Sequence, residues 1–327
     1  MVIASAPGKV ILFGEHAVVY PGHIGIAATI DKRAVVRAER SESGRCSISS
    51  ELGYCEFGQD YFRDVQSHSG HSPDWSTPHK TILAEIFKEY GYVPLKIEIK
   101  SDIRPRSHLG SGSAVYAALS HAVLAELNVA PDLHKVSELT YTGDMIAHGG
   151  KPSGIDSNTV TYGGLLKFTK AAEYGRCSFE FIKLSYALEL LICDSNEYSE
   201  TRKMVNLVEN NLRENSGLRA ELDDTYILAM GGLEALRARN LRAAGWAMLA
   251  NQKILAKLGV STSKTNNIVQ IATDAGAYGA KLTGAGGGGC VIILAEDYSG
   301  IEKALVAAGY ISTFRVKLGA EGVRAGK

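Results

Sequence analysis

This sequence of 327 residues lacks the features that mark several classes of protein. It has no excess of one charge, because 35 Lys and Arg residues balance 35 Asp and Glu residues. No global basic field exists to hold nucleic acid or an anionic membrane, so we expect no nucleic-acid partner. No run approaches the roughly 20 apolar residues of a membrane-spanning helix, so we expect no membrane either. The N-terminal stretch has no basic region before an apolar core and predicts no secretory signal.

Cysteine is sparse as well. The five cysteines are scattered, odd in number and never spaced as Cys-X-X-Cys. This pattern argues against a zinc ribbon and predicts reduced thiols in a cytoplasmic protein. The chain is nevertheless too long for one comfortable hydrophobic core, so we expect two domains. Because no global charge attracts phosphate groups, any bound phosphate must be held by a local group of hydrogen-bond donors or positive charges.

The order of the expected elements predicts an α+β fold. The first half has strands within 1–40, hairpins and a long surface loop over 41–78, a helix at 81–90, a strand at 95–99, and helices at 113–127 and 132–148. The second half has a strand at 189–194, helices at 200–215, 219–239, 241–258 and 263–275, a strand at 291–294, a helix at 301–308 and a strand at 310–316. We expect the halves to join within residues 170–187.

Three histidines, His68, His71 and His79, lie in or next to the expected loop region 41–78 and resemble a metal site at first sight. No carboxylate or cysteine stands at ligand spacing beside them, and their Ser, Gly and Pro neighbours are typical of loops. We therefore interpret all three as part of an exposed loop.

Glycine is abundant, at 35 residues, and it is clustered. Residues 105–114 read PRSHLGSGSA, a Gly/Ser loop that opens directly into a helix. The N–H groups at a helix N-terminus are unpaired and lie at the positive end of the helix dipole, so they bind anions. The loop is not a P-loop, because no Gly-Lys-Ser/Thr follows at that spacing. It predicts a phosphate site, although Ser/Gly caps without a ligand are also common.

A second motif, residues 6–19, reads APGKVILFGEHAVV. It predicts a strand that carries Lys9 among apolar residues and ends in a Gly-Glu-His turn. A lysine in an apolar strand needs a reason, and the ordinary one is an edge strand whose lysine reaches solvent.

A third motif, residues 281–290, reads KLTGAGGGGC. Four consecutive glycines cost much backbone entropy to order, so they indicate a place where the backbone passes close to a phosphate or to the motif at 6–19. A flexible linker is the alternative, but Thr283 and the apolar segments on each side argue against it.

Together the three motifs, at 6–19, 105–114 and 281–290 and so spread over nearly the whole chain, resemble the GHMP kinases. The motif at 6–19, with the runs at 152–156 (PSGID) and 161–164 (TYGG), is most similar to the mevalonate kinases. The resemblance implies a two-domain GHMP kinase fold. Its N-terminal domain, of the ribosomal-protein-S5-like α/β type, would span 1–178, and its C-terminal domain, ferredoxin-like α+β, would span 179–327. It further implies an enzyme that uses ATP and Mg²⁺ to phosphorylate mevalonate.

The resemblance also assigns residues. Asp156 is expected to be the catalytic base, with Lys9 beside it, and Asp144 to be the acidic Mg²⁺ ligand. The resemblance also allows a second mechanism, in which Lys9 and the metal do most of the activation, and the sequence does not choose between them. The mevalonate pocket is expected to include Glu15, His16 and Thr201. The residues expected to bind ATP lie in the phosphate loop: Pro105, Leu109, Gly110, Ser111, Gly112, Ser113 and Ala114.

The phosphate loop departs from the pattern of this family. The usual run is Gly-Leu-Gly-Ser-Ser-Ala-Ala, whereas residues 108–114 read His-Leu-Gly-Ser-Gly-Ser-Ala. Gly112 therefore stands where a serine commonly binds the metal, so either Ser111 or Ser113 takes over, or the metal relies more on Asp144 and phosphate. Asp144 replaces the commoner glutamate, and the segment 148–152 is one residue longer than usual.

Other readings remain open from the sequence. One alternative is an acceptor of another GHMP kinase class, such as phosphomevalonate or a sugar, and another is a catalytically silent sensor of this fold. Retention of Lys9, Asp144 and Asp156 together argues against the sensor. A homodimer is also left open.

Overall fold

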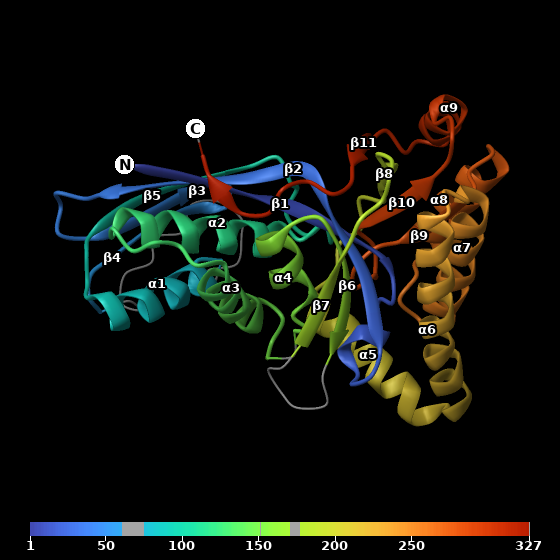
Figure 1. Cartoon of the computed structure of the whole chain (residues 1–327), viewed down its shortest axis with the longest axis horizontal. Helices are drawn as coiled ribbons and strands as arrows, with labels where there is room; N and C mark the ends of the chain where they lie inside the picture. Colours follow the sequence, from blue (N-terminus) through green and yellow to red (C-terminus); the bar gives the residue numbers. More distant parts are fainter. Residues whose placement is uncertain (61–74, 151, 171–176, 327) are drawn as a thin grey trace.

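The computed structural model describes residues 1–60, 75–150, 152–170 and 177–326. Two sheets follow one another along the long axis of the molecule, each with a layer of helices, and the helices within residues 216–274 form the end beyond the second sheet (Figure 1). Within the described residues, no helix is long and apolar enough to cross a membrane.

The first sheet is built around β1 (Val2–Phe13) and the long strand β2 (Ile24–Arg40), which pair antiparallel. Its order is β12-β1-β2-β5-β3-β4, and β6 pairs with both β2 and β7. The other strands are β3 (Cys46–Ser50), β4 (Gly53–Phe57), β5 (Leu95–Ser101), β6 (Leu165–Lys170), β7 (Cys177–Ile182) and β12 (Arg324–Ala325). The two ends of β2 therefore have different neighbours, β6 near its start and β5 near its end.

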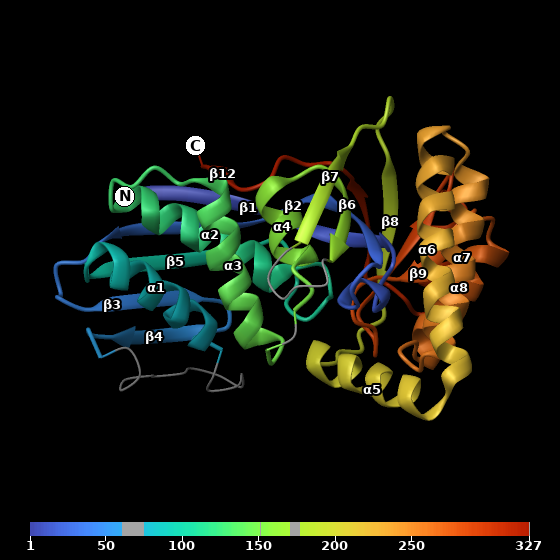
Figure 2. The ribbon, with the colours of Figure 1, turned by 60° about the horizontal axis from the view of Figure 1, so that its bottom comes forward.

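Helices cover one face of this sheet, as Figure 2 shows. They are α1 (Thr77–Tyr90), α2 (Ser111–Glu126), α3 (Leu133–Ala147) and α4 (Ile155–Tyr162). The Ala, Val and Leu side chains of α2 are buried on nearly all sides, because this helix lies between the sheet and α3. Asp132 caps α3, as predicted, by accepting a hydrogen bond from the Lys135 N–H at 3.1 Å.

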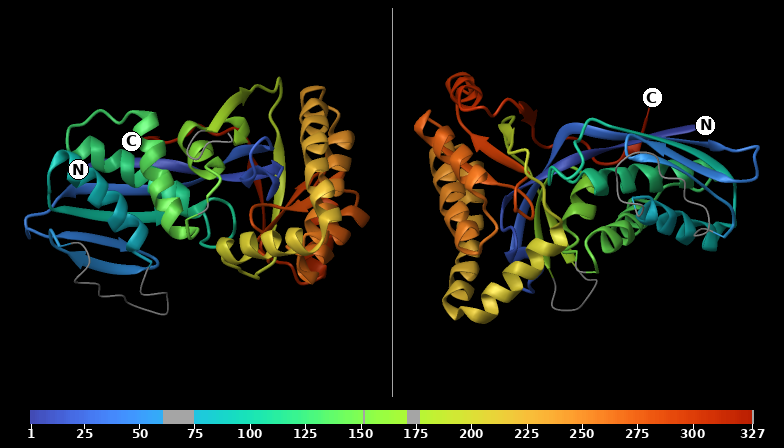
Figure 3. Two further views of the ribbon diagram at one scale, coloured as in Figure 1. Left: turned by 90° about the horizontal axis from the view of Figure 1, so that it is seen from below. Right: turned by 180° about the vertical axis from the view of Figure 1, so that it is seen from behind.

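The second sheet is antiparallel with the order β11-β8-β10-β9. Its strands are β8 (Glu189–Asp194), β9 (Gly279–Leu282), β10 (Cys290–Leu294) and β11 (Thr313–Lys317). The helices of this half are α5 (Thr201–Glu214), α6 (Ser216–Arg237), α7 (Leu241–Lys257), α8 (Ser263–Asp274) and α9 (Ser299–Ala307). Figure 3 shows α6, α7 and α8 as one layer, with α5 at the junction between the halves.

The end of the described chain returns to the first sheet, where β12 pairs with β1, so the two termini lie at the same end of the molecule (Figure 1). The expected domain boundary between residues 178 and 179 falls inside β7, which pairs with β6 in the first sheet.

The exposed-loop prediction for the histidines was wrong for His79. This residue lies in α1, is 5% exposed, and packs edge-on against Trp75 and Tyr116. The polar residues that precede it in the sequence suggested a loop, but His79 lies on the buried face of α1 with Ile82 and Ile86. His68 and His71 lie outside the described residues.

Candidate active site

Lys9 and Asp156 form an ion pair, with 3.0 Å between Lys9 Nζ and Asp156 Oδ1. Lys9 is 2% exposed, and its backbone N–H bonds to the Leu109 carbonyl of the phosphate loop, so the interpretation as an edge-strand lysine reaching solvent was wrong. Asp156 stands in the first turn of α4 and is 21% exposed. Gly154 caps this helix at φ +89°, a conformation that glycine adopts freely. The pair thus joins a buried strand to a helix N-terminus.

The phosphate loop lies directly against Lys9. The Lys9 N–H donates to the Leu109 carbonyl at 2.8 Å, and Lys9 Nζ donates to the His108 carbonyl at 3.4 Å. Gly110 caps α2 at φ +71°, and a Cβ atom there would lie 2.8 Å from the Lys9 side chain. The loop therefore needs glycine at this position both for its backbone conformation and for its close approach to Lys9.

The N-terminus of α2 offers free donors beside that pair. The first intrahelical bond runs from the Ala114 N–H to the Gly110 carbonyl at 2.9 Å, so the N–H groups of residues 111–113 have no partner in the helix. Of the residues expected to bind ATP, Ser111, Gly112 and Ser113 thus present backbone donors, whereas the Ala114 N–H is already used. Pro105 lies at the start of the loop.

Asp144 lies on α3 and is 1% exposed. The Ser113 hydroxyl donates to Asp144 Oδ1 at 2.7 Å, and Asp144 Oδ2 is buried without a partner among the described residues. Burial, together with the nearby Asp156 carboxylate, raises the pKa of Asp144 well above its usual value. The Ser111 hydroxyl instead donates to the Ile103 carbonyl at 3.1 Å. Of the two candidate serines, the structure therefore brings only Ser113 to Asp144.

Glu15 and His16 occupy the turn after β1, and both are buried. Glu15 forms an ion pair with Lys281, a fully buried residue of β9. Burial raises the pKa of Glu15, and Lys281 opposes that rise. Burial lowers the pKa of His16 to about 4, and His16 Nε2 lies 2.9 Å from the Ala285 carbonyl. At neutral pH the ring therefore donates from Nε2, which leaves Nδ1 as a hydrogen-bond acceptor.

The third motif is a fixed contact surface, so the alternative of a flexible linker was wrong. Thr283 is bonded to the backbone of Ile11 in β1, accepting from its N–H at 2.8 Å. All four glycines from 286 to 289 have positive φ. A Cβ atom on Gly289 would meet the His108 ring at 2.6 Å, and one on Gly288 would meet the Glu197 carbonyl at 2.3 Å. The glycine run is needed because it passes this close to the phosphate loop and to the segment after β8.

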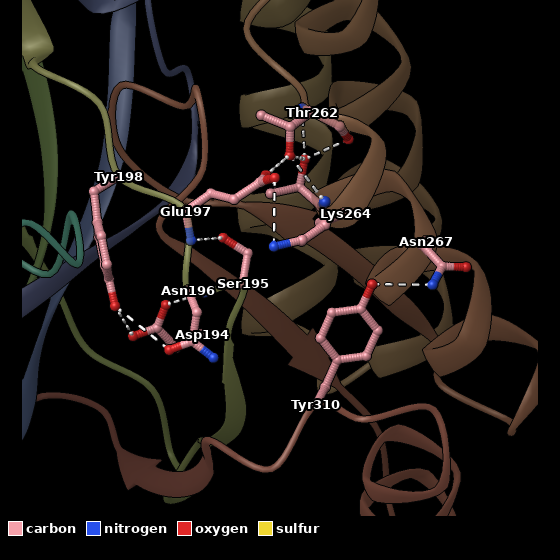
Figure 4. Close-up of polar contacts among 10 residues, drawn as sticks. Asp194, Ser195, Asn196, Glu197, Tyr198, Thr262, Lys264, Asn267 and Tyr310 are labelled. Carbon is pink, nitrogen blue, oxygen red and sulfur yellow. Dashed lines mark hydrogen bonds and ion pairs between the residues drawn. The ribbon is translucent and has the colours of Figure 1, made fainter.

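That segment is itself anchored by polar contacts, which Figure 4 shows. Glu197 Oε2 accepts a hydrogen bond from Thr262 at 2.6 Å, and Glu197 Oε1 lies 3.6 Å from Lys264. The Ser199 hydroxyl donates to the Gly286 carbonyl at 2.5 Å. Thr201 follows as the first residue of α5, but its hydroxyl makes no hydrogen bond within the part of the chain that the structure describes.

Three residues of the site were not predicted. Lys281 was quoted in the third motif without a role, although a lysine in an apolar strand is the same signal that singled out Lys9. His108 is partly buried at φ +64°, with Nδ1 unpartnered among the described residues and a pKa lowered by burial to about 4. Asn251 of α7 accepts a hydrogen bond from the Gly14 N–H at 3.3 Å. A single amide within a helix gives no sequence signal for that contact.

The arrangement matches known proteins along its whole length. The family described as GHMP kinases N terminal domain matches residues 78–164, and the family described as GHMP kinases C terminal matches residues 233–310. The mevalonate kinase of Thermococcus sibiricus is 32% identical, over 99% of this chain and 98% of that protein.

Solved structures agree in fold. The crystal structure of L. major mevalonate kinase in complex with R-mevalonate superposes with a TM-score of 0.78 at 24% identity, covering 97% of this chain and 96% of that one. The Methanococcus jannaschii mevalonate kinase gives a TM-score of 0.78 at 24% identity, covering 99% and 98%. The two-domain α+β fold predicted from the motifs is confirmed, and the chain belongs to the GHMP kinase family, among relatives that are mevalonate kinases.

Proposed function

We propose that this kinase transfers the γ-phosphoryl group of ATP to the primary hydroxyl of mevalonate, giving 5-phosphomevalonate and ADP. The observation that carries the proposal is the Lys9–Asp156 ion pair beside the free N-terminus of α2, in a chain whose nearly full-length relative is a mevalonate kinase. A phosphate held at the helix N-terminus and a hydroxyl held at Asp156 would then meet beside Lys9.

Asp156 is the proton acceptor in this mechanism. As the phosphoryl group moves to the acceptor oxygen, the hydroxyl proton passes to a carboxylate oxygen of Asp156. Lys9, held within 3.0 Å of Asp156, positions that carboxylate and stabilises negative charge that develops on the acceptor oxygen. The unpaired N–H groups of residues 111–113 bind the phosphate oxygens at the positive end of the α2 dipole. These groups are fixed before the reaction, so little reorganisation is needed.

The residues around Asp144 fit a Mg²⁺ ion. A hard divalent cation prefers oxygen ligands, and a kinase supplies one or two carboxylates while phosphate and water provide the rest. Asp144 Oδ2 is a buried oxygen with no hydrogen-bond partner among the described residues, and the Ser113 hydroxyl lies beside the same carboxylate. We infer that Asp144 and Ser113 hold the ion. When bound, Mg²⁺ would neutralise charge on the transferring phosphate oxygens.

The acceptor pocket would be formed by the turn that carries Glu15 and His16 and by the start of α5 at Thr201. The neutral His16 ring presents Nδ1 as an acceptor, and Glu15 has one oxygen that is not bound to Lys281. Two such acceptors suit a substrate with hydroxyl donors, as mevalonate has.

The direct test is an ATP-consumption assay of the purified chain with mevalonate, phosphomevalonate, galactose and homoserine, each with Mg²⁺ and with EDTA. We expect turnover of mevalonate in the presence of Mg²⁺ and its loss with EDTA. A folded protein that phosphorylates another of these alcohols but ignores mevalonate would refute the proposed acceptor. A folded protein that consumes no ATP with any of them would favour the sensor.

A further inference from the structure

Tyr116 of α2 carries its hydroxyl back to the N-terminus of its own helix. It stands four positions after Gly112, so the two residues lie on one face of α2, and long side chains of a helix point toward the helix N-terminus. A Cβ atom at Gly112 would lie 3.3 Å from Tyr116 Oη. The hydroxyl therefore lies beside a residue whose backbone N–H is one of the free donors of this helix.

Two glycines make room for this tyrosine. Gly112 stands where a serine is common in this family, and a side chain there would crowd the Tyr116 hydroxyl and ring, which lie 3.3–3.4 Å from the Cβ position. On α3, a Cβ atom at Gly143 would lie 2.6 Å from Tyr116 Cδ2, closer than two such atoms can approach. The exchange of serine for glycine at 112 thus fits the presence of a tyrosine one turn later.

The ring of Tyr116 is fixed, whereas its hydroxyl is free. The side chain is 6% exposed, and its ring packs edge-on against His79 with centroids 5.3 Å apart. Within the ranges that the structure describes, the hydroxyl makes no hydrogen bond. A tyrosine hydroxyl on a buried ring usually finds a partner. An unpartnered hydroxyl at a helix N-terminus therefore indicates a ligand that supplies the acceptor.

The Tyr116 hydroxyl is also a lasting donor. Burial, and to a smaller extent the Asp144 carboxylate, raise the pKa of Tyr116 above its usual value, so the hydroxyl keeps its proton at neutral pH. The two loop serines already donate their hydroxyl protons within the protein, Ser111 to the Ile103 carbonyl at 3.1 Å and Ser113 to Asp144 at 2.7 Å. Of the three hydroxyl groups, that of Tyr116 is the one left to donate to a ligand.

We propose that Tyr116 is a phosphate-binding residue of this kinase: its hydroxyl donates a hydrogen bond to a nucleotide phosphate oxygen held at the N-terminus of α2, in place of the serine hydroxyl that is missing at Gly112. The inference rests on the proposed function in one respect, that ATP places its phosphates at this helix terminus. A hydrogen bond from a neutral donor to a charged oxygen is stronger than one between neutral groups. A ring that is already fixed loses little entropy when that bond forms.

The experiment measures binding rather than turnover, with Tyr116→Phe as the main variant. Calorimetric titration with ATP in EDTA, without an acceptor alcohol, isolates the contacts of the protein with the phosphates. We expect the Kd for ATP to rise roughly ten- to a hundredfold, the usual worth of a hydrogen bond to a charged group. The Kd for adenosine, which has no phosphate, should not change. Thermal unfolding should stay as in the wild type, because the lost hydroxyl bonds to no described residue.

The matched control is Tyr278→Phe, which removes a hydroxyl from the second half of the chain. That hydroxyl donates to Glu296 at 2.6 Å, so it is bound to a surface carboxylate. Tyr278→Phe should leave the Kd for ATP and for adenosine as in the wild type.

A double variant, Tyr116→Phe with Gly112→Ser, tests whether the tyrosine replaces the serine. Gly112 lies within α2, so a serine fits its backbone and keeps the N–H that faces the phosphate. With the tyrosine hydroxyl gone, the added Cβ would meet the ring at 3.4 Å, an ordinary contact. We expect the double variant to bind ATP at least severalfold more tightly than Tyr116→Phe. Because EDTA removes the metal, the new serine can act only on phosphate.

Three results would overturn the inference. The first is a folded Tyr116→Phe protein that binds ATP as the wild type does. The second is an equal loss of affinity for ATP and adenosine, which would place the hydroxyl against the nucleoside. The third is a double variant that binds ATP no better than Tyr116→Phe. A wild-type chain that binds ATP but phosphorylates a different alcohol would refute the proposed acceptor and leave these measurements unaffected.

Discussion

Replacing Asp156 by Asn removes the charge of the catalytic carboxylate and keeps its shape. A positioned general base contributes roughly 10²–10⁴ in rate, so we expect kcat to fall by that factor, equivalent to about 3–5 kcal/mol of transition-state stabilisation. The KM for ATP should change little, because Asp156 is not expected to bind the nucleotide. The same substitution leaves Lys9, which is 2% exposed, without its ion-pair partner.

That buried cation sets the size of the effect on stability. Lys9 keeps its hydrogen bond to the His108 carbonyl at 3.4 Å and remains in the field of Glu15. Asp156 is 21% exposed, so part of the pair is already screened by solvent. We therefore expect the free energy of unfolding to fall by about 1–3 kcal/mol, below the usual cost of breaking a fully buried pair.

The assay follows ATP consumption with saturating mevalonate and Mg²⁺, with nucleotide binding and thermal unfolding measured on the same samples. Asp132→Asn is the matched control, because Asn caps a helix as well as Asp does and this residue caps α3 away from the site. The control should keep wild-type kcat and stability. A loss of kcat below tenfold in Asp156→Asn, with ATP binding intact, would show that Asp156 is not the base.

Three further predictions concern other parts of the molecule. Ser113→Ala should raise the Mg²⁺ concentration needed for half-maximal activity and lower kcat. Ser111→Ala should leave the Mg²⁺ requirement unchanged, because the Ser111 hydroxyl bonds to the Ile103 carbonyl; equal Mg²⁺ titration curves for the two variants would contradict this. Burial lowers the pKa of His79 from 6.5 to about 4. The unfolded chain therefore binds a proton in that pH range that the native state does not, and native stability should fall by about 3 kcal/mol as the pH drops through it. His79→Phe should flatten the dependence of unfolding on pH, and an unchanged slope would refute the assignment. Gly288 has φ +116°, and an added Cβ would lie 2.3 Å from the Glu197 carbonyl. Gly288→Ala should therefore cost at least about 2 kcal/mol of stability in a thermal melt, and a neutral result would show that the third motif can shift.

Local pattern was enough to predict most elements of the fold. The strand at 189–194 and the helices of the second half appear close to their expected bounds, because they are long or strongly patterned. Short elements were missed. Helix α4 (Ile155–Tyr162) was not among the expected elements, since eight residues with polar and β-branched side chains give little periodicity. Strand β9 (Gly279–Leu282) is four residues long and was absorbed into a glycine motif.

The contacts of the site that could not be predicted from the sequence join residues that are far apart along the chain. The Lys9–Asp156 neighbourhood was anticipated only through the family motifs, because no local rule relates residues so far apart. Glu15 and Lys281 are separated by 266 positions, and nothing in either motif reveals that they meet. The choice between Ser111 and Ser113 turned on which hydroxyl points toward α3. That depends on helix packing, so it required the structure. Their roles in metal binding stay predictions.

The return of residues 319–325 to the first sheet has a consequence for how the chain is made. Thr29 donates to the Ala320 carbonyl at 2.6 Å across 291 positions of sequence, and Arg33 donates to the Glu321 carbonyl at 2.7 Å. At about 5–20 residues per second, a ribosome would expose the first strands for roughly 15–60 s before those partners are synthesised. During that interval the β1 edge that β12 later covers is open to other chains. The first half should therefore not mature as an independent module during translation, and holdase chaperones that shield nascent β-strands should raise the yield of native protein.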